Sequence, residues 1–112
     1  MPNRSYLGEF ELLVMLALIR LGDEGAYGVP IGRAIEESSG REVAMGSVYA
    51  ALERLEQKGF VSSRVGDPTP DRGGRAKRYF HVTNAGLRQV RKTRQTLTSL
   101  WRGLPQLERG RI

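Results

Sequence analysis

The sequence predicts a mainly α-helical fold with one small β-hairpin. Apolar segments with helical spacing come first, followed by two short strand-like segments that flank a loop rich in Gly, Pro and Asp, and then by a last helical segment. The chain has 112 residues, which suits a single domain with one modest core. The pattern therefore favours one compact unit followed by a C-terminal helix.

The first helix is expected at residues 8–21. Apolar side chains cover nearly every face of this segment between Phe10 and Leu21, and a helix that is apolar all round must be buried on more than one side. Gly22 then supplies a stop signal. In so small a chain, another subunit is a candidate for the second covering surface.

The second and third helices each carry one apolar stripe, and we expect them at about residues 28–38 and 45–58. Gly59 follows the third helix at a position that favours the left-handed conformation. Phe60 then lies where a Schellman stop places a contact with Leu55. The inward side chains are Ile31, Ala34 and Ile35 in the second helix and Val48, Leu52 and Leu55 in the third.

Two strands are expected at residues 60–65 and 76–82, joined by a loop dense in turn residues. Thr83 is placed to cap a fourth helix, which we expect over about residues 84–102. Three helices, a hairpin and a further helix form the winged helix-turn-helix arrangement. The predicted units are a winged domain at 1–83, a C-terminal dimerisation helix at 84–104 and a frayed tail at 105–112.

Basic charge is concentrated in the second half of the chain. Residues 1–56 carry five Lys or Arg and nine Asp or Glu, a net charge of −4, whereas residues 57–112 carry thirteen and three, a net charge of +10. Such an asymmetry is typical of a surface that meets a polyanion such as DNA. Charge alone leaves a generically basic protein as an equal alternative.

The third helix and the hairpin carry the candidate DNA contacts. The first residues of a recognition helix lie near base edges, where small side chains permit close approach and Ser47 is able to donate a hydrogen bond. Alternatively, Ser47 only starts the helix and Tyr49 is a half-buried aromatic. The hairpin cations suit the phosphate backbone or the minor groove, or else form a solvated basic turn. The candidates are Met45, Gly46, Ser47, Tyr49, Ala50 and Arg54 in the helix and Arg72, Arg75, Lys77 and Arg78 in the hairpin.

The fourth helix carries a heptad seam that is apolar except for one arginine. Little of its own domain is left to cover this helix, so pairing with a second chain is expected. The alternative is a cap over the first helix of the same chain, and Trp101 either packs in the seam or stacks on a flat ligand. The candidate dimer interface comprises Leu87, Val90, Arg94, Leu97, Trp101 and Leu104, together with Leu12 and Leu16.

Catalysis, metal binding and membrane insertion find little support in the sequence. The chain has no cysteine, and its one histidine, His81, lies in a predicted strand without a carboxylate near it in sequence. The N-terminus lacks an apolar signal core, and the longest apolar run, residues 12–19, is too short to span a bilayer. We therefore expect a cytoplasmic protein without enzymatic activity, metal or cofactor.

Several segments, in this order and at this spacing, resemble the PadR family of bacterial transcriptional regulators, and the resemblance covers roughly residues 5–100. It implies a winged-helix domain and a C-terminal helix that dimerises. It also implies binding to a palindromic promoter site, usually as a repressor, with Tyr49 and the basic residues of the wing near DNA. The matching segments are LGEFELL (7–13), AYGVPI (26–31), GSVYAALERL (46–55), KGFV (58–61) and YFHVTNAG (79–86).

Two features depart from the common form of that family. Ala44-Met45 stands where a Ser-Pro helix start is frequent, and the C-terminal region is one short helix. Many relatives are released from DNA by small aromatic or drug-like molecules, so the resemblance makes a small aromatic effector a candidate ligand. The rival hypothesis is a winged-helix module that binds another protein and no DNA.

Overall fold

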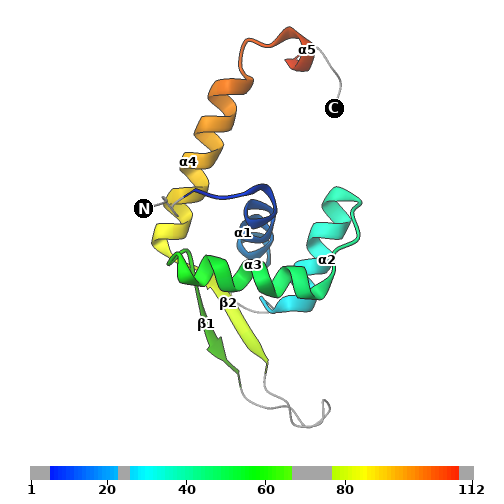
Figure 1. Ribbon diagram of the computed structural model, residues 1–112, viewed down its shortest axis with the longest axis vertical. Coiled ribbons are helices and arrows are strands. Elements are labelled where there is room, and N and C mark those ends of the chain that lie inside the picture. The colour runs from blue at the N-terminus through cyan, green and yellow to red at the C-terminus, as the bar shows by residue number, and fades with distance from the viewer. Residues whose placement is uncertain (1–5, 23–25, 67–76, 109–112) are drawn as a thin grey trace.

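The computed structural model describes residues 6–22, 26–66 and 77–108. Figure 1 shows the first three helices forming a compact body, with the hairpin projecting from one end and α4 rising from the other. This confirms the predicted mainly helical fold with a small hairpin. The elements are α1 (Glu9–Leu21), α2 (Gly28–Ser39), α3 (Met45–Gln57), β1 (Val61–Val65), β2 (Arg78–Val82), α4 (Asn84–Trp101) and α5 (Pro105–Glu108).

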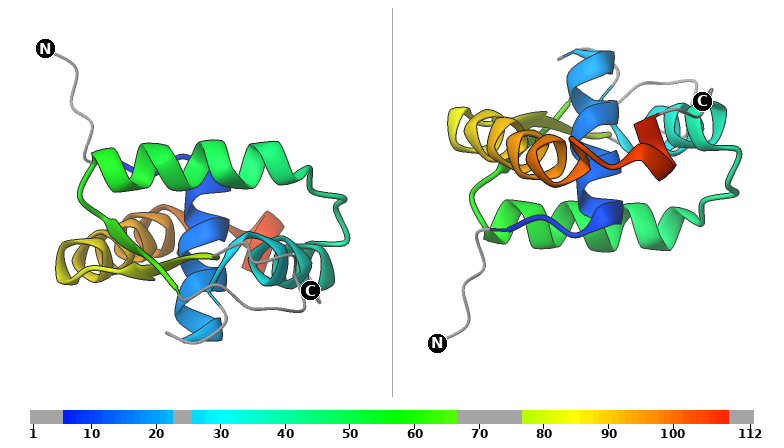
Figure 2. Two further views of the ribbon diagram at one scale, coloured as in Figure 1. Left: turned by 90° about the horizontal axis from the view of Figure 1, so that it is seen from below. Right: turned by 90° about the horizontal axis from the view of Figure 1, so that it is seen from above.

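The core lies where α1, α2 and α3 meet the base of the hairpin. Helix α1 contacts α2, α3, α4 and β2, and Figure 2 shows it running across both α3 and α4. The all-round apolar pattern of α1 is therefore explained largely within the chain, although Leu16 and Ile19 stay exposed. The largest fully buried side chains are Phe80, Met15, Ile31, Leu52, Leu55, Val14, Val48 and Val61.

Helix α3 ends in the predicted Schellman motif. Gly59 has a φ of +82°, a conformation that glycine adopts without steric cost. The N–H of Phe60 donates to the carbonyl of Leu55 at 2.9 Å, and the N–H of Gly59 donates to that of Glu56 at 3.0 Å. Because the N–H of Phe60 is hydrogen-bonded to the helix end, the strand begins one residue later than expected, at Val61.

The two strands pair antiparallel, with a register that runs from Val61 opposite Val82 to Val65 opposite Arg78. The N–H of Phe80 also donates to the carbonyl of Ala26 at 2.8 Å, so the segment before α2 is fastened to the hairpin. The bond therefore joins β2 to the start of α2, which lies far from it in sequence.

The predicted cap on α4 is confirmed, since the Thr83 hydroxyl accepts a hydrogen bond from the N–H of Gly86 at 3.1 Å. The helix ends at Trp101, and the segment expected to be a frayed tail contains the short helix α5. Within α4 only Gly86 is buried. In the ranges that the structure describes, the helices are each too short or too polar to span a bilayer.

Candidate nucleic-acid interface

The outer face of α3 is lined by small residues near its start. Val48, Leu52 and Leu55 are buried against the core, which turns the opposite side of the helix toward solvent. Gly46, Ser47 and Ala50 are all exposed there. Ala44 at the N-cap makes no side-chain hydrogen bond to the helix, so the first N–H groups of α3 have no side-chain cap.

The structure turns Met45 inward, away from the face predicted to meet DNA. Its side chain is partly buried and packs against the core, and its methyl group lies so close to Gly32 of α2 that a Cβ there would overlap it. The physical reason is helical spacing, because Met45 precedes the buried Val48 by three residues and shares its stripe. Met45 is therefore a packing residue at the α2–α3 contact.

Tyr49 lies at the junction of α3, α2 and the hairpin. Its side chain is 40% exposed, and its ring centroid lies 6.5 Å from that of Phe80 in β2. The ring crosses directly over Gly28 at the start of α2, where a Cβ would overlap the phenol. Glycine at this position therefore makes room for the ring, which holds the hydroxyl of Tyr49 beside the first turn of α2.

Arg54 is tied to a buried carboxylate that the sequence patterns did not reveal. Glu11 in the first turn of α1 is only 6% exposed. It accepts hydrogen bonds from Arg54 Nε at 3.1 Å, Lys58 Nζ at 2.8 Å and the N–H of Gly8 at 3.0 Å. Arg54 and Lys58 thereby link the start of α1 to the end of α3, while Gly8 is the N-cap residue of α1 itself.

Burial raises the pKa of Glu11, but the hydrogen bonds from Lys58, Gly8 and Arg54 outweigh it and hold the pKa below its usual range.

A carboxyl with a lowered pKa stabilises the fold above the unfolded-state pKa, about 4.3, and loses that contribution as the pH falls through the folded-state value. We therefore expect the unfolding free energy to fall more steeply below about pH 4.3 in the wild-type protein than in E11Q. Urea unfolding across a pH series checks this, and parallel profiles would contradict it.

The hairpin places its cations in two different settings. Arg72 and Arg75 lie outside the described residues. Arg78 donates to Glu56 of α3 at 2.7 Å and to Ser63 at 3.1 Å, so its guanidinium fastens the hairpin to α3. Arg78 therefore has a structural role, which the sequence did not predict because the contact joins two elements.

Aromatic rings support two cations near the loop end of the two hairpin strands. The Lys77 ammonium lies 4.4 Å from the ring centroid of Tyr27 and 3.3 Å from its hydroxyl. The Arg64 guanidinium lies 5.0 Å from the ring centroid of Tyr79, and the two rings meet edge to face at 5.5 Å. Arg64 was not among the DNA contacts predicted from the sequence. The signal that was available is its position at the end of a strand, beside a basic loop.

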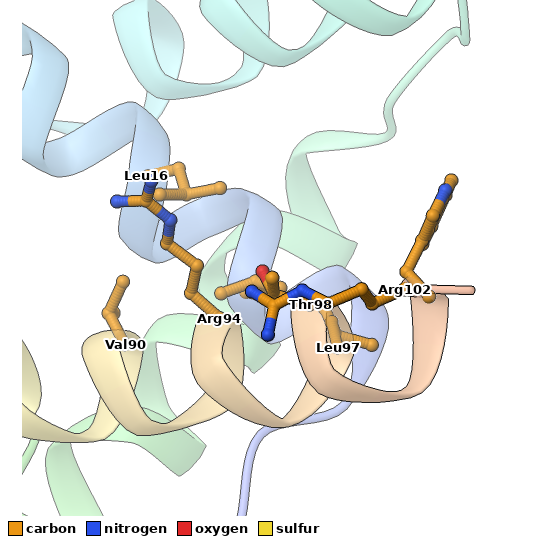
Figure 3. Close-up of a pocket in the computed structure, with 8 residues that line it drawn as sticks. Leu16, Val90, Arg94, Leu97, Thr98 and Arg102 are labelled. Atoms are coloured by element: carbon orange, nitrogen blue, oxygen red, sulfur yellow. The ribbon is translucent and has the colours of Figure 1, made fainter. Parts of the chain in front are cut away.

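A groove between α1 and α4 collects most of the predicted dimer residues. Its volume is about 470 Å³, and Figure 3 shows Arg94 of α4 reaching across it toward Leu16 of α1. Leu87 is half-buried at the base of α4, and Leu104 lies beyond its end. The α1–α4 groove is lined by Leu12, Leu16, Val90, Arg94, Leu97, Thr98, Trp101 and Arg102.

The family model described as the transcriptional regulator PadR-like family matches residues 15–92. The chain belongs to the PadR-like family. This confirms the resemblance seen in the sequence, and the matched family is one of transcriptional regulators.

Individual relatives agree with this PadR-like assignment. An uncharacterized 37.1 kDa protein in transposon TN4556 of Streptomyces fradiae is 35% identical over 86 residues. That match covers 77% of this chain but only 23% of the relative, so the chain spans about a quarter of that protein's length.

Solved structures share the fold over nearly the whole chain. A PadR family regulator from Eggerthella lenta DSM 2243 is 27% identical with a TM-score of 0.67, and the match covers 92% of this chain and 88% of that one. A PadR-like regulator from Bacillus cereus strain ATCC 14579 shares the fold at 20% identity, with a TM-score of 0.69 and coverage of 91% and 93%. A complex structure of hsRosR-SG is 25% identical with a TM-score of 0.69, covering 96% and 88%.

Proposed function

We propose that this PadR-like protein binds duplex DNA sequence-specifically as a homodimer and represses transcription from a palindromic promoter site. The observation that carries the proposal is the outer face of α3, where Gly46, Ser47 and Ala50 are exposed, together with Arg64 and Lys77 near the loop end of the hairpin strands. Small residues permit close approach to base edges, and flanking cations suit phosphates. A regulator of this kind acts on the chromosome, which places it in the cytoplasm.

The start of α3 is suited to an anion. An α-helix presents free N–H groups and a partial positive charge at its N-terminus, and phosphates bind there. Ala44 offers no side chain to occupy these groups, and Ser47 adds an exposed hydroxyl within the first turn. A DNA phosphate would take the place that a capping side chain fills in other helices.

The proposed homodimer depends on the apolar side chains that α4 leaves exposed. Leu97 and Trp101 are 46% and 52% exposed on its groove side, and Leu16 of α1 is exposed on the facing side. A large apolar surface that one chain leaves open marks an interaction site, and a heptad seam suits a second helix. We therefore assign the α1–α4 groove to a second copy of the same chain.

A two-fold dimer explains the palindromic site. Two identical recognition helices related by a two-fold axis read two half-sites related by the same axis. Repression follows when such a dimer occupies a promoter and blocks access to it. A small aromatic effector also belongs to the proposal. It would bind where the two chains meet in the α1–α4 groove, because Trp101 offers a ring face there and Arg94 and Arg102 offer cations.

The competing function is a protein-interaction module without DNA binding. The cations near the loop end of the hairpin favour DNA, because an acidic or apolar wing would suit a protein partner better. The deciding experiment is a gel shift with the duplex immediately upstream of the protein's own gene, with an unrelated duplex for comparison. Specific retardation at physiological salt supports the proposal, and no retardation of either duplex at low salt contradicts it.

The hairpin, which is the proposed wing, and α3, which is the proposed recognition helix, are expected to respond differently to substitution. Lys77→Ala and Arg75→Ala should weaken binding to all duplexes about equally and lower the salt slope by about 1 per protomer, because phosphate contacts carry no sequence information. Ser47→Ala should instead change the base preference. Selection from a random duplex library and salt titrations measure both effects.

The matched controls are Lys92→Ala on α4 and Ser38→Ala on α2, both at exposed positions away from the proposed interface. Because Lys77 also packs on Tyr27, the melting temperature of K77A must be measured alongside. If K77A and R75A stay folded and bind as tightly as the wild-type protein, the wing does not contact DNA.

A further inference from the structure

One edge of the Arg54 guanidinium is hydrogen-bonded to Glu11, and the other edge is exposed. Its Nε donates to Glu11 Oε2 at 3.1 Å, while the side chain remains 52% exposed. Across the residues that the structure describes, its two terminal nitrogens make no hydrogen bond. Arg54 lines a hollow together with Ser47 and Ala50, so the open edge lies beside the face of α3 proposed to meet DNA.

Glu11 is also held by Lys58, so Arg54 is not required to balance its charge. Lys58 Nζ lies 2.8 Å from Glu11 Oε1, and the Lys58 side chain is only 14% exposed. Lys58 also donates to the carbonyl of Tyr6 at 3.1 Å. Because Lys58 already neutralises the carboxylate, the pair leaves Arg54 with an unbalanced positive charge that faces solvent.

We propose that Glu11 is a positioning residue for DNA binding, which holds the Nε of Arg54 so that the two terminal nitrogens face a backbone phosphate. This inference rests on the proposed DNA-binding function and adds a residue of α1 to it. The planar fork of arginine allows one edge to be held while the other binds a phosphate. Fixing the fork before DNA arrives removes part of the entropy cost of ordering a long side chain.

Lysine at position 54 would lack this ability. An ammonium group is a single point charge on a flexible stem, so it would pair either with Glu11 or with a phosphate. The variant R54K therefore keeps the charge of the wild-type protein and loses the bridge. It also leaves Glu11 with its bonds to Lys58 and Gly8, so the buried carboxylate keeps two donors and the fold is retained.

The test is a double-substitution cycle in DNA affinity, using the duplex that the wild-type protein selects from a random library. R54A should weaken binding roughly 10-fold and lower the salt slope by about 1 per protomer. E11Q should weaken binding roughly 3–10-fold in the wild-type background and have little further effect in the R54A background. R54K should bind nearly as weakly as R54A.

The matched control is E37Q, which removes the same charge from an exposed position on α2. Glu37 does not line the hollow beside Arg54, so E37Q should bind like the wild-type protein. Circular dichroism and melting temperature verify the folding of each variant. Should E11Q fail to fold, R54K serves as the test, because Glu11 keeps its bonds to Lys58 and Gly8 in that variant.

Two results would overturn the role of Glu11. One is an E11Q effect of equal size in the wild-type and R54A backgrounds, which would mean that Glu11 acts only through the fold. The other is wild-type affinity in R54K. A wild-type protein that binds no duplex even at low salt contradicts the proposed function itself, and that outcome is distinct from both.

Discussion

Leu97→Asp and Trp101→Asp are expected to convert the protein into a monomer that binds a palindromic site about 10²–10⁴-fold more weakly. Both side chains line the α1–α4 groove and are half exposed in the single chain. A carboxylate there would be desolvated and unpaired once a second chain covers the groove. Two linked half-site readers bind with a high effective concentration, which a monomer loses.

Analytical ultracentrifugation and operator titrations of both variants measure this. The matched control is Thr96→Asp, which adds the same charge to α4 at an exposed position outside the groove and should remain dimeric. In the intact dimer, half-sites on one side of the duplex should lie about 10 base pairs apart or a multiple of that. Dimeric L97D and W101D with unchanged operator affinity would place the pairing surface elsewhere, with α1 as the next candidate.

DNA affinity is expected to fall about 10³–10⁵-fold between about 50 and about 200 mM salt, if the dimer makes roughly 6–10 phosphate contacts. The reason is counterion release, because each Lys or Arg that neutralises a phosphate frees a condensed cation. The net charge of +10 on residues 57–112 supplies the cations in each chain. The logarithm of the binding constant should therefore decrease linearly with the logarithm of the salt concentration.

Fluorescence anisotropy with a labelled duplex at five or more salt concentrations gives the slope. The double variant R75A/K77A should show a shallower slope, while K92A should match the wild-type protein. A slope near zero would exclude a phosphate-dominated mode and would favour the interaction module without DNA binding.

Local sequence signals determined the order of elements and most of their ends. Gly59 and Phe60 predicted the end of α3, and Thr83 predicted the start of α4, because caps and stops depend on a few consecutive residues. The apolar stripe through Val48, Leu52 and Leu55 was equally readable, since helical spacing alone places these side chains on one face. The heptad seam on α4 likewise predicted the residues that gather at the groove.

Partners between distant elements were decided only by the tertiary structure. Glu11 meets Arg54 and Lys58 across separations of 43 and 47 residues, and Arg78 finds Glu56 across 22. These pairs depend on how α1 crosses α3 and how the hairpin folds back on α3, which packing of the whole core sets. The periodicity of a single helix carries no information on such crossings, so Glu11 looked like an ordinary first-turn glutamate and Arg78 like a free wing cation.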